Sequence, residues 1–169
     1  MIIHCTRRLA AKLPDVSAAP LEDTSPLGNW HAHLYHIDRR QCVLFCHDES
    51  RFVLFLPGLK KEQFAELGNN WFKPLFAATL AALGCSQARV SRAELALGAV
   101  RFDTATDRSV LSAMNIAFDH ELYPRVARVP NVLNLEPIAI SCEMSDRPTW
   151  IRRKPIWPDR RMLEIVAAL

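Results

Sequence analysis

Three short apolar runs, joined by very short polar breaks, constrain the fold of this chain more than any other feature. The runs cover residues 30–37, 41–47 and 52–56, and the breaks cover 38–40 and 48–51. Apolar or alternating runs of this length are typical of strands, and breaks this short join antiparallel neighbours. The sequence therefore predicts a three-strand antiparallel meander.

The segments before the meander predict a strand, a helix and a loop. The apolar run 1–5 predicts the strand, and Thr6 can cap a short helix over 7–13 that ends before Pro14. Residues 14–26 are rich in Pro, Ser, Asp and Ala and have no apolar period, so they predict a long loop that could act as a lid.

The segments after the meander are mostly helical in pattern. Helices are expected over 59–83 with a break near 68–70, over 86–97, from Thr106 or Asp107 to about 122 before Pro124, and over 160–169. Short strands are expected over 100–103, 132–135 and 138–142, and 147–158 is expected to be irregular. The first strand and the one near Phe102 can lie side by side in parallel. The fold class is therefore α+β, with helices on a mainly antiparallel sheet.

Composition indicates one globular domain over residues 1–169, with a basic and aromatic C-terminal segment at 147–169. Half of the 169 residues are hydrophobic and 23% are charged, which is not a disordered composition. The formal net charge of +3 is too small to name a partner, because nucleic-acid-binding proteins usually show a stronger basic excess.

Cysteine usage and apolar run lengths favour a cytoplasmic protein without a membrane partner. The five cysteines are an odd number, none forms a CxxC pair, and the apolar start is too short for a secretory signal. No run approaches the roughly 20 apolar residues that span a bilayer. GxSxG, HExxH, P-loop and GxGxxG motifs are absent, so no reaction is indicated and no cofactor is expected.

Five stretches of the first 120 or so residues resemble a known family in the same order. They are 1–6 (MIIHCT), 27–33 (LGNWHAH), 38–45 (DRRQCVLF), 57–61 (PGLKK) and 104–115 (TATDRSVLSAMN). The chain is similar here to a bacterial family known only as a domain of unknown function. The resemblance implies a shared fold and a bacterial source, but no activity. That family often has Tyr-Ala-Asn where this chain has His31-Ala32-His33, and the resemblance does not place the segment after Pro130.

A polar stripe on the helix after Asp107 is the first candidate ligand site. Its residues follow one another at intervals of four, three and four, which places them on one side of a helix: Arg108, Ser112, Asn115 and Asp119. An arginine near the positive helix end, with an amide and a carboxylate, can hold a phosphate ester. The alternative is a solvated helix face whose Asp107 is only a cap.

Histidines and a cysteine of the meander are a weaker candidate for a metal site. His31 and His33 point to the same side of a strand, and a turn at Arg39-Arg40 would place His33 opposite Cys46. These three side chains would offer nitrogen and sulfur ligands to zinc. The neighbouring Cys42 and Leu44 favour an apolar core instead, so no metal is assigned.

Two further candidates lie near the ends of the chain. His4 and Cys5 are adjacent on a strand, so they point to opposite faces and cannot form a nucleophile–base pair; Cys5 is expected to be buried and His4 partly exposed. The C-terminal segment offers aromatic and basic contacts at Trp150, Arg152, Arg153, Lys154 and Trp157. These suit a protein interface, anchoring to the domain, or stacking on nucleic acid.

The sequence favours a non-catalytic binding or interaction module whose partner is another protein or a second copy of the chain. One alternative is an enzyme that acts on a phosphate-bearing substrate, in which Arg108 and Asn115 hold the phosphate and Asp119 or His120 moves a proton. The other alternative is a nucleic-acid-binding protein that uses the C-terminal segment.

Overall fold

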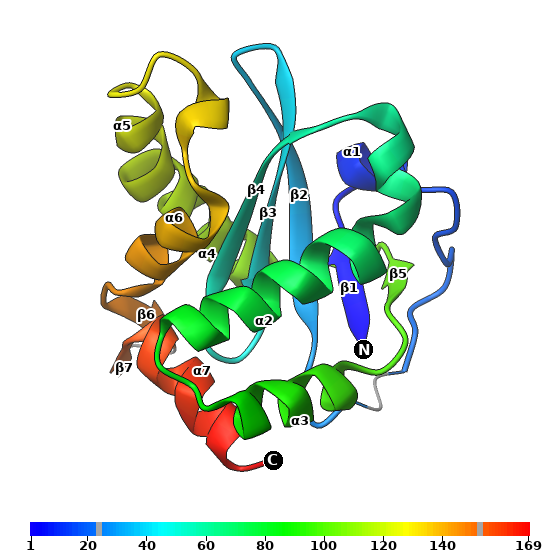
Figure 1. Ribbon diagram of the computed structural model, residues 1–169. Coiled ribbons are helices and arrows are strands. Elements are labelled where there is room, and N and C mark those ends of the chain that lie inside the picture. Colours follow the sequence, from blue (N-terminus) through cyan, green and yellow to red (C-terminus); the bar gives the residue numbers. More distant parts are fainter. Residues whose placement is uncertain (23–24, 152–153) are drawn as a thin grey trace.

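A computed structural model describes residues 1–22, 25–151 and 154–169 and shows a mixed α+β fold around a five-stranded sheet (Figure 1). The strand order is β4-β3-β2-β1-β5. The strands are β1 (Ile2–Cys5), β2 (Trp30–Ile37), β3 (Arg40–His47), β4 (Val53–Leu59) and β5 (Arg101–Asp103). β2, β3 and β4 form the predicted antiparallel meander. β1 runs parallel to both β2 and β5, which confirms the expected pairing of the first strand with the one near Phe102.

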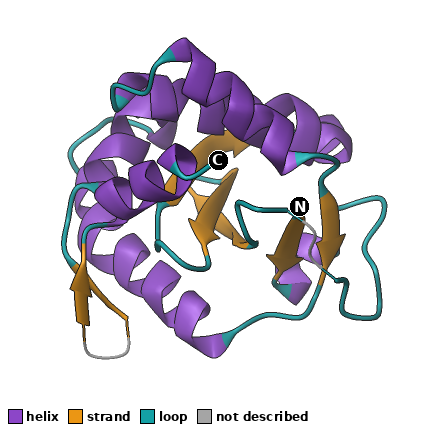
Figure 2. Cartoon of the chain, turned by 90° about the horizontal axis from the view of Figure 1, so that it is seen from below, coloured by secondary structure: helices purple, strands orange, loops and turns teal. Residues whose placement is uncertain are grey.

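Helices surround this sheet, and a separate two-stranded hairpin projects from the C-terminal region (Figure 2). The α-helices are α1 (Arg7–Ala10), α2 (Lys73–Ala82), α3 (Gln87–Leu97), α4 (Arg108–Ile116), α5 (Tyr123–Val126), α6 (Pro137–Ser145) and α7 (Pro158–Ala167). The 3-10 segments are η1 (Lys61–Glu66) and η4 (Val132–Asn134), the π-helical segments are η2 (Leu67–Phe72) and η3 (Ala117–Leu122), and the hairpin is β6 (Thr149–Ile151) with β7 (Lys154–Ile156). None of the described helices is long and apolar enough to cross a bilayer.

The two faces of the sheet carry separate hydrophobic cores. α2 crosses one face, with α3 and α7 beside it (Figure 1), and their apolar residues join those of the strands, including Trp30, Phe45 and Phe72. The opposite face contacts α4, η3 and α6 through residues such as Cys46 and Met114. Because side chains alternate along a strand, each strand of the meander supplies both cores.

Helix α6 runs along β4 and completes the hydrogen bonds of that edge strand. The N–H of Val53 donates to Ser145 Oγ at 3.1 Å, and Ser145 Oγ donates back to the Val53 carbonyl at 3.2 Å. The N–H of Phe55 donates to Ser141 Oγ at 3.0 Å. Two serines four residues apart, on one side of a helix, thus take the place of a sixth strand.

Both π-helical segments lead directly into a proline. In η2 the N–H of Lys73 donates to the carbonyl of Gly68, and in η3 the N–H of Tyr123 donates to the carbonyl of Phe118. Pro74 and Pro124 follow at the first turn of α2 and α5. The wider π turn accommodates a residue without an N–H. For this reason the expected stop before Pro124 is wrong, and the helix continues to Val126.

The β2–β3 turn differs from the turn expected at Arg39-Arg40. Asp38 and Arg39 form the two-residue turn and both have positive φ, at 48° and 62°, which is a type I′ geometry. His33 therefore lies opposite Leu44, and His31 lies opposite Cys46. Neither turn residue is glycine, so the sequence carried no signal for this register.

The C-terminal third holds the other corrections. Residues 132–135 and 138–142, expected as strands, lie in the 3-10 segment η4 and in α6, which Glu136 caps by accepting from the Ala139 N–H at 2.7 Å. Residues 147–158, expected to be irregular, contain the β6–β7 hairpin. The terminal helix α7 is confirmed.

Candidate functional site

Two histidine–aspartate pairs lie side by side on the sheet. The register of β5, β1 and β2 aligns Asp103, His4 and His31 in one row across three strands. His4 Nδ1 lies 2.6 Å from Asp103 Oδ1, and His31 Nδ1 lies 2.6 Å from Asp48 Oδ1 in the β3–β4 turn. The centroids of the two imidazole rings are 5.0 Å apart. Because neighbouring strands present this row on one face, segments far apart in sequence meet here.

Asp103 is a fully buried carboxylate that ties three segments together. It accepts hydrogen bonds from His4, from the Leu21 N–H at 2.9 Å and from the Ala105 N–H at 3.0 Å. Burial acts to raise the pKa of Asp103, but these hydrogen bonds, with that from Leu21 first, outweigh it and hold the pKa below its ordinary value. The carboxylate is therefore ionised and accepts a hydrogen bond from the Nδ1–H of His4.

The two histidines differ in which ring nitrogens have a hydrogen-bond partner. His31 is buried, its Nδ1 faces Asp48, and its Nε2 accepts the backbone N–H of Asp107 at 2.6 Å. A backbone N–H can only donate, so His31 is neutral with its proton on Nδ1. Nε2 of His4 has no partner among the described residues, and one tenth of that side chain is exposed.

Asp107 caps α4, as the sequence predicted. Its backbone N–H also links the helix to the histidine row. Asp107 Oδ1 accepts from the N–H groups of Ser109 at 2.7 Å and Val110 at 3.1 Å. The bond from Val110 is the largest influence that lowers the pKa of Asp107. The cap keeps this carboxylate ionised, with its second oxygen free of partners among the described residues.

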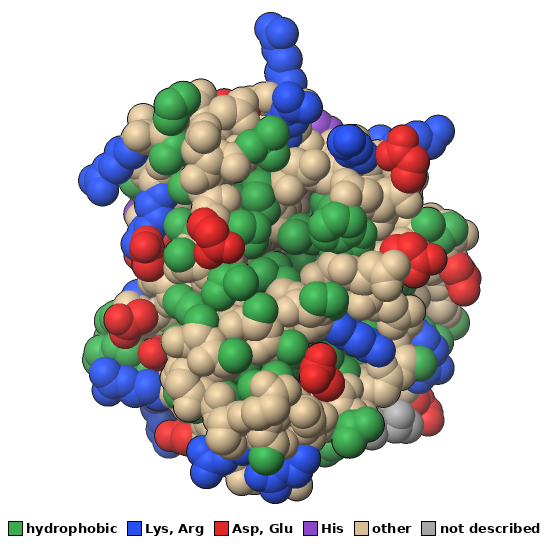
Figure 3. Space-filling view, viewed as in Figure 1, with side chains coloured by type: hydrophobic (Ala, Val, Ile, Leu, Met, Phe, Trp, Pro, Cys, Tyr) green, Lys and Arg blue, Asp and Glu red, His purple; other side chains and the backbone are tan. Residues whose placement is uncertain are grey.

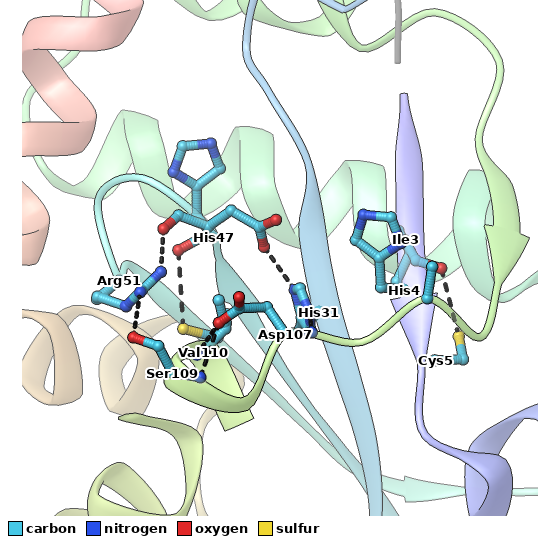
Figure 4. Close-up of polar contacts among 12 residues, drawn as sticks. Ile3, His4, Cys5, His31, His47, Arg51, Asp107, Ser109 and Val110 are labelled. Carbon is cyan, nitrogen blue, oxygen red and sulfur yellow. Dashed lines mark hydrogen bonds and ion pairs between the residues drawn. The ribbon is translucent and has the colours of Figure 1, made fainter. Parts of the chain in front are cut away.

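Arg51 is the most unusual residue near this helix start. Its backbone φ of 59° lies in the left-handed region, which costs a residue other than glycine roughly 1–2 kcal/mol. Its side chain is buried, at 7% exposure, and donates to the Asp48 carbonyl and, at 3.0 Å, to Ser109 Oγ (Figure 4). No carboxylate of the described residues lies within ion-pair distance of its guanidinium. The fold therefore holds a strained backbone and a buried guanidinium without a direct ion pair among the described residues at one position.

These groups surround a hollow that we call the turn–helix pocket. Its volume is about 670 Å³, and it is lined by Asp48, Glu49, Arg51, Asp107, Ser109, Val110 and Ile151. The lining comes from the β3–β4 turn, the start of α4 and the β6–β7 hairpin. Figure 4 shows Arg51 and Ser109 facing each other, with Asp107 and His31 beside them. Three carboxylates and one guanidinium thus share a small space.

The predicted helix stripe lies outside this pocket. Its four residues, Arg108, Ser112, Asn115 and Asp119, are all exposed. Asn115 Oδ1 accepts from the Tyr35 hydroxyl at 3.4 Å, and Asp119 contributes to raising the pKa of Tyr35, after burial as the main cause. The C-terminal half of the stripe, Asn115 and Asp119, therefore lies near Tyr35 toward the end of β2. The residues that meet in the pocket are instead Arg51, Asp107 and Ser109.

The three weak metal candidates do not converge. Both ring nitrogens of His31 are engaged, and His33 Nδ1 lies 2.8 Å from the Thr6 hydroxyl. Cys46 is fully buried, and burial is the main cause that raises the pKa of its thiol to about 12. Among residues 1–22, 25–151 and 154–169, no three His, Cys, Asp or Glu side chains are placed to hold a metal ion.

The C-terminal candidates lie on or beside the β6–β7 hairpin. Trp150 is 69% exposed and Lys154 is exposed, whereas Trp157 is half-buried with the Arg160 guanidinium 5.0 Å from its ring centroid. Arg152 and Arg153 lie outside the described residues. Figure 3 shows one face of the molecule, on which Lys and Arg are interspersed with Asp and Glu. That face is not a continuous basic surface.

Sequence reasoning missed the His–Asp pairs and Arg51 for different reasons. Asp103 is 99 residues from His4, and only the parallel β1–β5 pairing joins them. His4 was expected to be partly exposed but is buried, as is Cys5. Glycine or asparagine usually occupies a left-handed turn position, so an arginine gives no sequence indication of that conformation. The run of polar residues after β3 was the one available hint.

Comparison with known proteins gives a family but no activity. A family model described as a domain of unknown function (DUF6933) matches residues 2–161. The match extends past Pro130, so the C-terminal hairpin and the start of α7 also lie within the family pattern, contrary to the resemblance over the first 120 residues alone. A search of curated proteins finds no match to the chain.

Proposed function

We propose that this chain, which belongs to the DUF6933 family of unknown function, is a binding module that holds a small polar ligand in the turn–helix pocket. The observation that carries the proposal is Arg51. Three of the five N–H groups of its guanidinium have no partner among the described residues, although the side chain is buried. A buried guanidinium with unused N–H groups is costly, so the arrangement favours a ligand that accepts hydrogen bonds from them.

The surroundings of Arg51 support a preformed site. The Asp48 carbonyl and the Ser109 hydroxyl fix the guanidinium, and the Asp107 cap fixes Ser109. His31 in turn joins Asp48 to the Asp107 backbone. A ligand would therefore meet side chains that are already ordered, which reduces the entropic cost of binding.

A fragment screen by two-dimensional NMR tests the proposal, with polar fragments, nucleotides and metal ions as probes. We expect ligands that perturb the backbone signals of residues 48–51 and 107–110. The Arg51→Gly variant is a matched control, since glycine tolerates the left-handed φ of this position while the guanidinium is lost. Hits that bind the variant equally well, or no hits at the pocket, would refute the proposal.

The β6–β7 hairpin supports a second role, in which the chain docks on a protein partner or a second copy of itself. The supporting observation is Trp150, a large apolar side chain that is 69% exposed on a two-stranded hairpin. Exposed tryptophans are frequent centres of binding energy at interfaces. Trp150 therefore marks the surface that a partner would cover.

Sedimentation over a wide concentration range tests self-association through the hairpin. Trp150→Ser should lower the association constant, while Leu95→Ser, which removes a comparably exposed side chain from α3, should not. A parent protein that is monomeric at every concentration excludes the second copy. Oligonucleotide binding that weakens with salt would assign the hairpin to nucleic acid instead.

A further inference from the structure

The turn–helix pocket carries groups of both charges. The donors are the Arg51 guanidinium and the Ser109 hydroxyl, 3.0 Å apart. The acceptors are Asp48 and Asp107, each of which uses only Oδ1 in the described hydrogen bonds, so that Oδ2 of both is free of partners there. The pocket therefore offers donors for an anion and acceptors for a cation within one space.

Glu49 does not change this balance, because it is already paired. Its Oε1 contacts the Arg161 guanidinium from α7. Of the remaining charged groups in the lining, Asp48 and Asp107 are negative and Arg51 is positive. A ligand with a net negative charge, such as a phosphate ester, would meet more repulsion than attraction.

A simple cation would not satisfy the pocket either. It would pair with the two aspartates but leave the Arg51 guanidinium without an anion, and the two positive charges would repel. A ligand with both an ammonium and a carboxylate satisfies the donors and the acceptors together. Its carboxylate can accept two parallel hydrogen bonds from a guanidinium, which is a strong and geometrically specific contact.

We propose that the turn–helix pocket binds a zwitterion of the α-amino-acid type with a small apolar side chain. Arg51 and Ser109 hold the carboxylate, the free oxygens of Asp48 and Asp107 hold the ammonium, and Ile151 of the hairpin contacts the apolar group. This inference rests on the proposed binding function and names the ligand class for the same site.

Three probes that share the isobutyl side chain of leucine separate the two charges. They are L-leucine, isoamylamine, which lacks the carboxylate, and 4-methylpentanoate, which lacks the ammonium. Titration followed by NMR should show L-leucine binding about tenfold or more tightly than either analogue, since each lost contact is a charge-assisted hydrogen bond. Equal binding of L-leucine and isoamylamine, or tighter binding of inorganic phosphate, would overturn the zwitterion.

Two variants test which residues contact the ammonium and which contact the carboxylate of the ligand. Asp107→Asn retains a capping oxygen but loses the charge, so it should remove the advantage of L-leucine over 4-methylpentanoate. Arg51→Gly should remove the advantage of L-leucine over isoamylamine. Thermal unfolding of both variants checks that the fold is retained.

The screen keeps the two proposals distinguishable. Fragments of another class that bind the pocket, together with failure of all three leucine-type probes, would refute the zwitterion and support the binding function. Failure of every fragment and every probe at residues 48–51 and 107–110 would refute both.

Discussion

The two faces of the central sheet each carry a hydrophobic core, but they differ in chemistry over β5, β1 and β2. On the α2 face, Trp30 meets Phe72 and Phe76 at ring distances of 4.9 and 5.5 Å. On the other face, the same region of the sheet carries Asp103 and His4, joined by a hydrogen bond and not by apolar contact. Apolar neighbours can relax in part around a shortened side chain. A buried polar group that loses its hydrogen-bond partner, by contrast, keeps its full desolvation cost. In this part of the sheet the apolar contacts therefore secure stability, and the polar row of Asp103, His4 and His31 fixes which loops meet.

A histidine on each face shows the difference in detail. His47, on the α2 face, donates from Nε2 to the Leu27 carbonyl at 2.6 Å and accepts the Ser50 N–H on Nδ1 at 3.1 Å. His31 has the reverse arrangement, with its proton on Nδ1. His47 closes a turn under an aromatic cluster, while His31 connects two carboxylate-bearing segments beside a pocket.

The largest expected effect comes from the apolar face. Phe72→Ala removes a fully buried ring that contacts Trp30, Phe45 and Phe76, so we expect a loss of about 4 kcal/mol in the free energy of unfolding. Denaturant titration followed by circular dichroism measures it. A loss similar to that of the exposed-site control Leu95→Ala would contradict the assignment of this face as the main core.

A smaller but still large loss of unfolding free energy is expected at the Asp103–His4 pair. Asp103→Asn replaces one acceptor oxygen with a donor that faces a donor, so one of the bonds to His4, Leu21 or Ala105 is lost, and we expect a loss of about 2–3 kcal/mol. Hydrogen exchange of the Leu21 and Ala105 amides should rise with it. Unchanged exchange at both amides would show that Asp103 does not tie these segments.

The acid limb of stability should distinguish Asp103 as well. Because its folded pKa is depressed, its contribution is present above the unfolded value of about 3.9 and is lost as the pH falls through the folded pKa. The parent should therefore lose more stability than Asp103→Asn as the pH falls from about 5 toward 2. Parallel curves for the two proteins would argue against an ionised Asp103.

His47 should make the apolar face sensitive to milder acid. Burial is the main cause that lowers the pKa of His47, so below about pH 6.5 the unfolded chain binds more protons than the folded chain. Stability should then fall as the pH falls from about 7 to 5, and the fall should be shallower in His47→Gln. His33, whose pKa is lowered mainly by burial, contributes with the same sign and remains in the variant. Identical slopes would exclude His47 as a source.

The smallest effect is expected at Arg51. Glycine relieves the left-handed backbone but loses two hydrogen bonds, so the unfolding free energy of Arg51→Gly should lie within about 1 kcal/mol of the parent. Thermal melts measure it, with Arg51→Ala as a comparison that loses the same bonds without relieving the strain. A severe loss in both variants would show that the guanidinium mainly stabilises the fold and is not a ligand contact.

Local patterns in the sequence predicted the elements that depend on near neighbours. The meander follows from apolar runs and short breaks, and the start of α4 follows from Asp107 as a cap. Residues 138–142 were misassigned because a short, mainly apolar run has no clear period. The i, i+4 serines of α6, Ser141 and Ser145, were the available signal of a helix there.

The candidate site was harder to predict because its contacts are long-range or depend on backbone conformation. Asp107 to His31 spans 76 residues and involves a backbone N–H, which carries no sequence information. The Arg51–Ser109 contact spans 58 residues and depends on a left-handed turn that the residue type does not announce. The stripe from Arg108 was selected by spacing, but the side of α4 that faces the pocket begins one residue later.

The serines of α6 bear on how the chain behaves at high concentration. Strands at the rim of a sheet can template the addition of another chain, and that is a common route to fibres. Here the rim at β4 is occupied by hydroxyl groups of the same molecule, and at the opposite rim the Ser17 N–H donates to the Phe102 carbonyl of β5. Both rims of the five-stranded sheet are therefore less open to the addition of a strand from another molecule.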